Sequence, residues 1–412
     1  MFDRDRWEEI YQTLRSNKLR TALTAFGVFW GIFMLIVMLG AGNGLQNAVF
    51  DGFGDFATNS CFMWTKQTSV SYKGFPRGRF WNFHNSDMKA LLANIPEIDA
   101  LAPKLQPWDG NGGGNNVVHG TKTGAYSIMG DYPDYNKIDP VTMLQGRFIN
   151  QIDIEEKRKI CVIGIKVRSE MFKKDENPLG QYLRIKGVYF QVVGVYEPKN
   201  KNMNFGGDKE ATINIPFTVM QIAYNFGDVV HFFAVTAKKR IPASVVEDKC
   251  IQIISQRNMI SPEDGQAIGH FNLEKEFKQM NGLFAGIQGL IWIVGIGTLI
   301  AGVIGVSNIM LIIVKERTKE IGIQRALGAS PWRVISQVIS ESVVLTAMSG
   351  ILGLILGVFT VEAINYALNA SGGGGEMFLN PTVDFKIASA SLLEMASSKF
   401  FISRKLSIAN AM

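Results

Sequence analysis

The sequence has 412 residues, of which 47% are apolar and 19% are charged, and its formal net charge is +6. Charged residues are absent from three intervals, 21–50, 279–314 and 342–361. Each interval reaches the roughly 20 residues that a helix needs to cross a bilayer. This segregation of charge excludes a purely soluble or a disordered protein.

Basic residues gather before the first apolar interval and between the second and the third, and they do not form one patch interleaved with aromatic residues. We therefore expect no nucleic-acid partner. The positive-inside rule places both basic groups in the cytoplasm. This topology predicts a multi-pass protein of the cell inner membrane, in contact with membrane lipid, with a cytoplasmic N-terminus and a large external segment.

The expected fold class is a membrane protein with an α-helical transmembrane region and a large α+β extracytoplasmic domain. In chain order, we expect a cytoplasmic amphipathic helix (1–20), span one (21–41), the extracytoplasmic domain (42–280), a stalk and span two (282–314), a cytoplasmic loop (315–333), span three (334–365), and an external loop with a C-terminal tail (366–412). In the first segment, Trp7, Ile10, Tyr11 and Leu14 have helical spacing, which favours a helix in the membrane interface over one packed on protein.

The extracytoplasmic segment alternates two kinds of pattern. β-branched and aromatic residues with turn-formers between them predict strands in 159–165, 182–196 and 211–215, and helical periodicity predicts helices over 86–94 and 242–256. The glycine-rich stretches 110–116 and 372–375 predict flexible external loops. An α+β domain is therefore expected outside the membrane.

Several kinds of chemical site are not expected in this chain. A P-loop needs glycine, four residues, and then Gly-Lys-Ser/Thr, which the sequence lacks. The four histidines have no partner at metal-ligand spacing, and Cys61, Cys161 and Cys250 are too few and too far apart for a disulfide framework or a zinc site. We expect no metal, no cofactor and no ATP hydrolysis by this chain, so it is not expected to be an enzyme.

Two spans carry small residues at intervals of four, Gly297, Ala301 and Gly305 in span two, and Ser349, Gly353 and Gly357 in span three. Small side chains let helices approach closely in lipid, so these residues predict a helix interface within or between subunits. The alternative is that glycine and alanine are simply common in transmembrane helices. Glu341 and Glu362 lie at the ends of span three, and no span has a charged residue near its centre. Ion-coupled transport usually needs such a residue, so a secondary transporter is disfavoured.

Span two is longer than a bilayer requires. Its 36 uncharged residues, 279–314, would extend roughly 54 Å as a helix, so part of it is expected to form a stiff stalk outside the lipid. The loop that follows has alternating charges, an apolar stripe that includes Ile321 and Ile323, and a stop signal at Gly328. A helix this short must dock on something to be stable; the alternative is a solvated connector.

Here the residues resemble a known family. Asn308-Ile309-Met310, the segments 315–322 and 325–329, and the entry into span one at 17–21 resemble the MacB/FtsX-type permeases of ABC transporters. Gly146-Arg147-Phe148 with Asp153, and the segments 162–164, 177–180 and 190–195, resemble the MacB-type periplasmic core.

The resemblance implies a partner for the loop. In this family the loop engages a separate ABC ATPase subunit, which assigns the contact to Lys315, Glu316, Arg317, Thr318, Glu320, Ile321, Gly322, Arg325, Ala326, Leu327 and Gly328. One departure is Gln324, where the family usually has a basic residue. The resemblance also implies pairing of the spans, as a homodimer or with a paralogous permease.

The resemblance implies a permease that transmits ATP-driven closure to its external domain and so drives export of a cargo. Partners would include a periplasmic adaptor and an outer-membrane channel. The alternatives are an FtsX-like mechanotransmission subunit that regulates a cell-wall hydrolase, and a lipoprotein-releasing permease. The family has a fourth span, but Glu394 and Lys399 interrupt the corresponding segment, so the tail is expected to be degenerate and not to cross the membrane.

Overall fold

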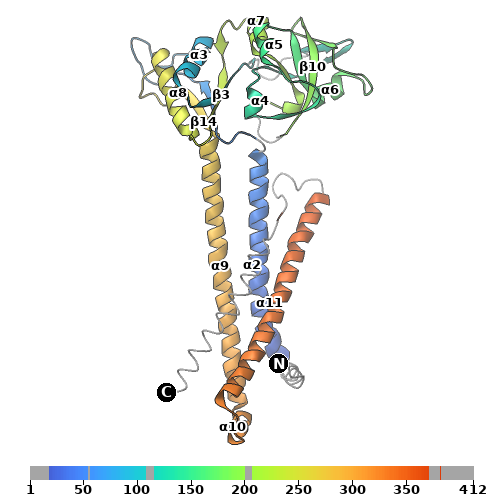
Figure 1. The fold of residues 1–412 in the computed structure, drawn as a ribbon, viewed down its shortest axis with the longest axis vertical. Helices are drawn as coiled ribbons and strands as arrows, with labels where there is room; N and C mark the ends of the chain where they lie inside the picture. Colours follow the sequence, from blue (N-terminus) through green and yellow to red (C-terminus); the bar gives the residue numbers. More distant parts are fainter. Residues whose placement is uncertain (1–17, 54–55, 108–115, 200–206, 371–380, 382–412) are drawn as a thin grey trace. The chain divides into compact units, whose positions relative to one another are not determined.

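The computed structural model describes residues 18–53, 56–107, 116–199, 207–370 and 381 (Figure 1). The expected N-terminal amphipathic helix, the glycine-rich loops over 110–115 and 372–375, and the tail with Glu394 and Lys399 lie outside these residues. The chain divides into two compact units. We call them the helical unit, Met1–Asp51 with Gly282–Met412, and the sheet unit, Gly52–Asn281.

Long apolar helices dominate the helical unit. Its elements are α2 (Lys18–Phe53), α9 (Leu273–Glu316), α10 (Thr318–Ala326) and α11 (Pro331–Ala370). Within the described residues, α2, α9 and α11 are the three helices that are long and apolar enough to cross a membrane. Helices α2 and α9 extend beyond the limits expected for spans one and two, and the first turns of α9 carry charged residues, Glu274, Lys275, Glu276 and Lys278.

The three long helices pack side by side in the helical unit (Figure 1). Val28, Ile32 and Ile36 of α2 are buried in one cluster with Val303 and Val306 of α9. Leu354 and Val358 of α11 pack against the same cluster. Helix α2 is therefore the common partner of α9 and α11.

The sheet unit contains a four-stranded antiparallel sheet in the order β14-β1-β13-β3. Its strands are β1 (Ser60–Thr65), β3 (Ile98–Lys104), β13 (Phe232–Ala237) and β14 (Ile268–Asn272). Associated with it are β2 (Phe83–His84), which pairs with β12 (Val229–Val230), and the helices α3 (Asn85–Asn94) and α8 (Ala243–Arg257). The two helices form where the sequence predicts them.

A second, mixed sheet has eight strands in the order β5-β4-β9-β10-β8-β11-β6, with β7 also paired to β10. They are β4 (Val117–His119), β5 (Lys122–Gly124), β6 (Ser127–Asp131), β7 (Val141–Gly146), β8 (Ile160–Gly164), β9 (Tyr182–Ile185), β10 (Val188–Pro198) and β11 (Thr212–Pro216). The accompanying helices are α5 (Gln151–Glu155), α6 (Ile165–Met171), η1 (Lys209–Ala211) and α7 (Phe217–Ala223), whereas α4 (Tyr135–Ile138) packs against β3 and β13 of the four-stranded sheet.

The predicted strand region 182–196 forms a hairpin of β9 and β10. The turn lies at Lys186 and Gly187, which have φ values of 45° and 86°. Glycine adopts a positive φ readily. Two successive residues with positive φ form the tight turn that joins two antiparallel strands. The turn at these two residues therefore divides the predicted strand region into two antiparallel strands.

One hydrophobic core reaches both sheets, and a buried ion pair lies where β3 meets β6. Leu105 and Gly130 exchange two backbone hydrogen bonds of 3.1 and 2.9 Å. Beside them, Lys104 Nζ lies 2.9 Å from Asp131 Oδ1, and both side chains are buried. Because a charge in a protein core needs a partner, this pair ties the two sheets to one relative arrangement.

Candidate functional site

Helix α9 passes into α10 through a single non-helical residue, Arg317, whose φ and ψ are −89° and 9°. The N–H of Arg317 still donates to the Ile313 carbonyl at 3.0 Å, and the N–H of Ile321 donates to the Arg317 carbonyl at 2.9 Å. The Thr318 hydroxyl donates to the Lys315 carbonyl at 2.7 Å. The loop therefore begins as a bend in a nearly continuous helix.

The other end of α10 stops at Gly328, the residue that the sequence marks as a stop. Gly328 has a φ of 93°. Its N–H donates to the Arg325 carbonyl at 3.1 Å, and the N–H of Ala329 donates to the Gln324 carbonyl at 3.0 Å. This pair of bonds is the Schellman arrangement, in which a glycine in the left-handed conformation satisfies the last carbonyl groups of a helix.

Helix α10 has no buried residue in this chain. Of the residues assigned to the ATPase contact, Arg317 and Ile321 are half-buried and the other nine are exposed. Ile323 and Leu327 expose 62% and 84% of their surface, and Trp332 at the start of α11 is also exposed. Clustered apolar groups of this kind on a solvated element indicate a surface that another molecule covers.

An ion pair connects this loop to α11. Arg317 Nη1 lies 3.8 Å from Glu341 Oε2, and the Glu341 side chain is buried. Sequence reasoning placed Glu341 only at the end of a span and missed this contact. Its signal was a lone carboxylate one residue before an uncharged interval and close in sequence to the basic loop.

The small residues of α11 lie against α2. A Cβ on Gly357 would come within 2.9 Å of Ile36, and one on Gly353 would meet the Phe29 backbone. Ser349 is buried, and its hydroxyl donates to the Leu345 carbonyl at 2.7 Å. This stripe is therefore an interface within the chain.

The small residues predicted on α9 lie elsewhere. Around Gly297 and Gly305 a Cβ would meet nothing within 4 Å, and Ala301 is exposed. The glycines of α9 that approach α2 are Gly295, where a Cβ would meet the Leu35 side chain, and Gly302, where a Cβ would lie 3.3 Å from the Gly27 carbonyl oxygen. Sequence reasoning missed the pair of Gly302 and Gly27, although Gly27 precedes Gly31 by four residues in an uncharged helix.

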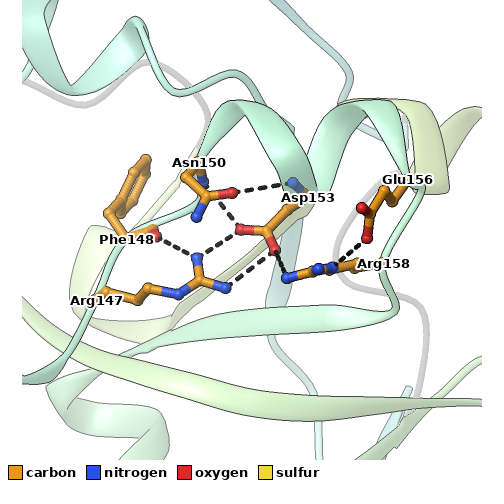
Figure 2. Close-up of polar contacts among 6 residues, drawn as sticks. All are labelled: Arg147, Phe148, Asn150, Asp153, Glu156 and Arg158. Atoms are coloured by element: carbon orange, nitrogen blue, oxygen red, sulfur yellow. Dashed lines mark hydrogen bonds and ion pairs between the residues drawn. The ribbon is translucent and has the colours of Figure 1, made fainter.

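In the sheet unit, Arg147 of the Gly146-Arg147-Phe148 motif contacts Asp153 (Figure 2). Arg147 donates to both oxygens of the buried Asp153 carboxylate, at 2.5 and 3.0 Å. The Asn150 N–H donates to Asp153 at 3.0 Å, and the Asn150 side chain accepts from the Asp153 N–H at 3.0 Å, which caps α5. Arg158 Nη1 lies 3.9 Å from the same carboxylate.

These contacts set the charge state of Asp153. Burial raises the pKa of Asp153, but the hydrogen bonds from Arg147 and from the Asn150 backbone outweigh burial, so the net pKa is lowered. A carboxylate with a lowered pKa, ionised at neutral pH and held by several hydrogen bonds, is suited to holding a loop rather than to transferring protons. We therefore interpret this motif as structural.

Among the described residues, no three His, Cys, Asp or Glu side chains come together in a way that could hold a metal ion. Cys61, Cys161 and Cys250 are buried free thiols. Burial raises the pKa of all three, that of Cys250 to about 12. Since the thiolate is the reactive form, none of them has the features of a nucleophile.

Two family models match the chain. The model described as a MacB-like periplasmic core domain matches residues 21–252, more than half of the chain, and the model described as an FtsX-like permease C-terminal region matches residues 292–403. The second match continues past the described part of α11 into the tail.

Among similar curated proteins, a pyoverdine export ATP-binding/permease protein, PvdT, of Pseudomonas entomophila is 28% identical over 82% of this chain and 49% of its own length. A macrolide export ATP-binding/permease protein, MacB, of Bdellovibrio bacteriovorus is 26% identical over 84% of this chain and 52% of its own length. The chain thus spans about half the length of these relatives. The crystal structure of the periplasmic region of MacB from Actinobacillus actinomycetemcomitans matches 55% of the chain and 94% of that structure, with 15% identity and a TM-score of 0.43.

Proposed function

Because the chain belongs to the MacB/FtsX-type permeases of ABC transporters, we propose that it couples ATP hydrolysis to a conformational change in its extracytoplasmic domain that drives export of a cargo. The observation that carries this proposal is α9. One uninterrupted helix of 44 residues continues from strand β14 of the sheet unit to Glu316, next to the exposed helix α10. A displacement of α10 can therefore be transmitted along a rigid element.

ATP hydrolysis is assigned to a region outside these 412 residues. The names of the relatives describe ATP binding together with a permease, whereas this sequence lacks a P-loop. We therefore assign the chain a non-enzymatic role, with a separate ABC ATPase subunit that covers the exposed apolar and charged residues of α10. The contact comprises the residues 315–328 named above.

The relatives' names, export of pyoverdine and of macrolides, favour export over regulation of a cell-wall hydrolase or lipoprotein release. Further partners are a second permease copy or a paralogue, a periplasmic adaptor and an outer-membrane channel. The unpacked face of Gly297, Ala301 and Gly305 supports pairing between subunits. We also assign the chain to the inner membrane with a cytoplasmic N-terminus, and we retain the seven segment boundaries given above.

The test is co-purification of the full-length chain with the ATPase encoded beside it. Replacing Glu316 and Arg317 together by alanine should abolish the complex and the stimulation of ATP hydrolysis. The matched control replaces Lys275 and Glu276, residues of the same types near the other end of α9, and should leave the complex intact. A complex that survives the first change with unaltered stimulation would refute the contact.

A further inference from the structure

The segment between β1 and β2, residues 66–82, folds back on itself, and we call it the basic hairpin. At its tip the N–H of Tyr72 donates to the Phe75 carbonyl at 3.1 Å, and the N–H of Phe75 donates to the Tyr72 carbonyl at 3.0 Å. Trp81 packs against the core, but two other aromatic residues of the hairpin do not, since Phe80 is 82% exposed and Phe75 is 39% exposed. Exposed aromatic side chains on a well-formed element indicate an interaction surface.

The charge of this segment has one sign. From Phe56 to Ser86 the sequence contains no Asp or Glu, whereas the hairpin carries Lys66, Lys73, Arg77 and Arg79. Basic residues gathered on one segment create a potential that attracts partners of the opposite sign and increases their rate of association.

The base of the hairpin is held by Asp264, a buried carboxylate from the segment before β14. Its oxygens accept from the N–H and hydroxyl of Ser69, each at 2.7 Å, and from the N–H of Val70 at 3.1 Å. They also accept from the N–H groups of Gln266 and Ala267. Three of these five donors belong to the hairpin, so the carboxylate of Asp264 links the hairpin to the segment before β14.

Two further contacts order half-buried side chains of the hairpin. Arg79 donates from Nη2 to the Asn258 carbonyl at 2.6 Å, and its guanidinium carbon lies 4.2 Å from the centre of the Phe75 ring. Trp81 donates from Nε1 to the Lys66 carbonyl at 2.8 Å. A surface that is already ordered loses less conformational entropy when a partner binds.

Strand register gives the place of the hairpin within the sheet unit. Strand β1 pairs antiparallel with β14, with Cys61 opposite Asn272 and Thr65 opposite Ile268. The chain passes into α9 directly after Asn272, whereas the hairpin follows Thr65, at the other end of the same strands. A partner can therefore reach the hairpin without displacing the connection to α9.

We propose that the basic hairpin is a docking surface for an acidic protein partner, whose carboxylates face Lys73 and Arg77 and whose apolar side chains cover Phe75 and Phe80. Arginine and aromatic residues are enriched at the centres of protein interfaces and dominate their binding energy. A pre-ordered arrangement of both favours a protein over a lipid surface. This inference is independent of the proposed coupling to ATP.

The test places a photo-crosslinking amino acid at position 80 of the full-length chain in its native cells. We expect an adduct whose crosslinked partner peptide, identified by mass spectrometry, is acidic. The double reversal Lys73→Glu with Arg77→Glu, which spares Arg79, should lower the adduct at least about tenfold. Reversing charge in the identified partner peptide should restore it. The control Lys159→Glu with Lys174→Glu, at two exposed lysines of the same unit, should change nothing.

Other outcomes overturn the proposal. These are no adduct, an adduct to lipid or to a second copy of this chain, a partner peptide without excess acid, or an adduct that the reversal leaves unchanged. Binding of the purified full-length chain to phosphatidylglycerol vesicles that is lost in the reversal would instead assign the hairpin to a membrane surface. The milder variant Arg77→Ala, checked by thermal unfolding, keeps the test decisive should the double reversal not fold.

Discussion

Gly353 of α11 lies so close to Phe29 of α2 that a Cβ on Gly353 would be 2.6 Å from the Phe29 carbonyl oxygen. Backbone cannot withdraw as a flexible side chain can. Gly353→Ala should therefore separate the two helices and lower the free energy of unfolding by about 1–3 kcal/mol. Gly289→Ala, on α9 but outside the stripe of Gly297, Ala301 and Gly305 and with no atom within 4 Å of its Cβ among the described residues, should stay within about 0.5 kcal/mol. Thermal unfolding of both full-length variants in detergent measures the two changes in stability. Equal losses of stability would contradict the assigned packing.

The exposed stripe on α9 gives a separate prediction for pairing between subunits. Ala301→Leu adds bulk where the single chain shows no contact partner for the stripe, so folding and insertion should be unaffected. If the stripe is the subunit interface, disulfide crosslinking between cysteines placed along it should fall, because the helices can no longer approach. Unchanged crosslinking would leave the stripe facing lipid.

The contact of Arg317 with Glu341 predicts that α10 is held against α11. Glu341→Gln keeps the side-chain size but removes the charge of a buried carboxylate. The attraction between the two side chains should weaken by about 1 kcal/mol, a small value because Arg317 is partly exposed to solvent. Spin labels at positions 319 and 340 should then report a broader distance distribution. Glu362→Gln, an exposed acid near the other end of α11, is the control. An identical distribution in both variants would show that the ion pair does not hold the loop.

Asp153 predicts a pH dependence of stability. Its pKa in the folded chain lies below the ordinary value of 3.8, so its contribution to stability is complete above that value and is lost as the pH falls through the lowered pKa. Asp153→Asn should lower the free energy of unfolding at pH 7 by about 1–2 kcal/mol. The two unfolding curves should converge at acid pH. A difference that is constant between pH 7 and pH 2 would show that packing, not charge, explains the effect.

The buried pair of Lys104 and Asp131 predicts non-additive substitutions. Lys104→Met alone leaves a carboxylate buried without its counter-charge and should cost about 3–5 kcal/mol. Adding Asp131→Leu should recover most of that loss, because two apolar groups need no partner. Chemical denaturation of the full-length chain measures both variants. A double variant less stable than Lys104→Met would refute the compensation.

Much of this protein follows from local sequence. An uncharged interval of sufficient length can only be accommodated in lipid or in a core, so the three long helices could be predicted from the distribution of charge. The end of α10 was also predictable, because Gly328 can adopt a positive φ that other residues avoid. The helices α3 and α8 followed from their apolar periodicity, and the family from motifs spread along the chain.

The contacts between distant residues followed only from the tertiary structure. Gly353 and Gly297 have similar surroundings in the sequence, yet among the described residues a Cβ on Gly353 would meet α2, whereas one on Gly297 would meet no atom within 4 Å. The sequence offered the isolated carboxylate of Glu341, but it did not identify Arg317 as its partner. Periodicity identifies which residues share a face of a helix, but the rotation and crossing of the helices decide which face meets a neighbour. That choice depends on the packing of all three helices at once, so no segment of the sequence contains it alone.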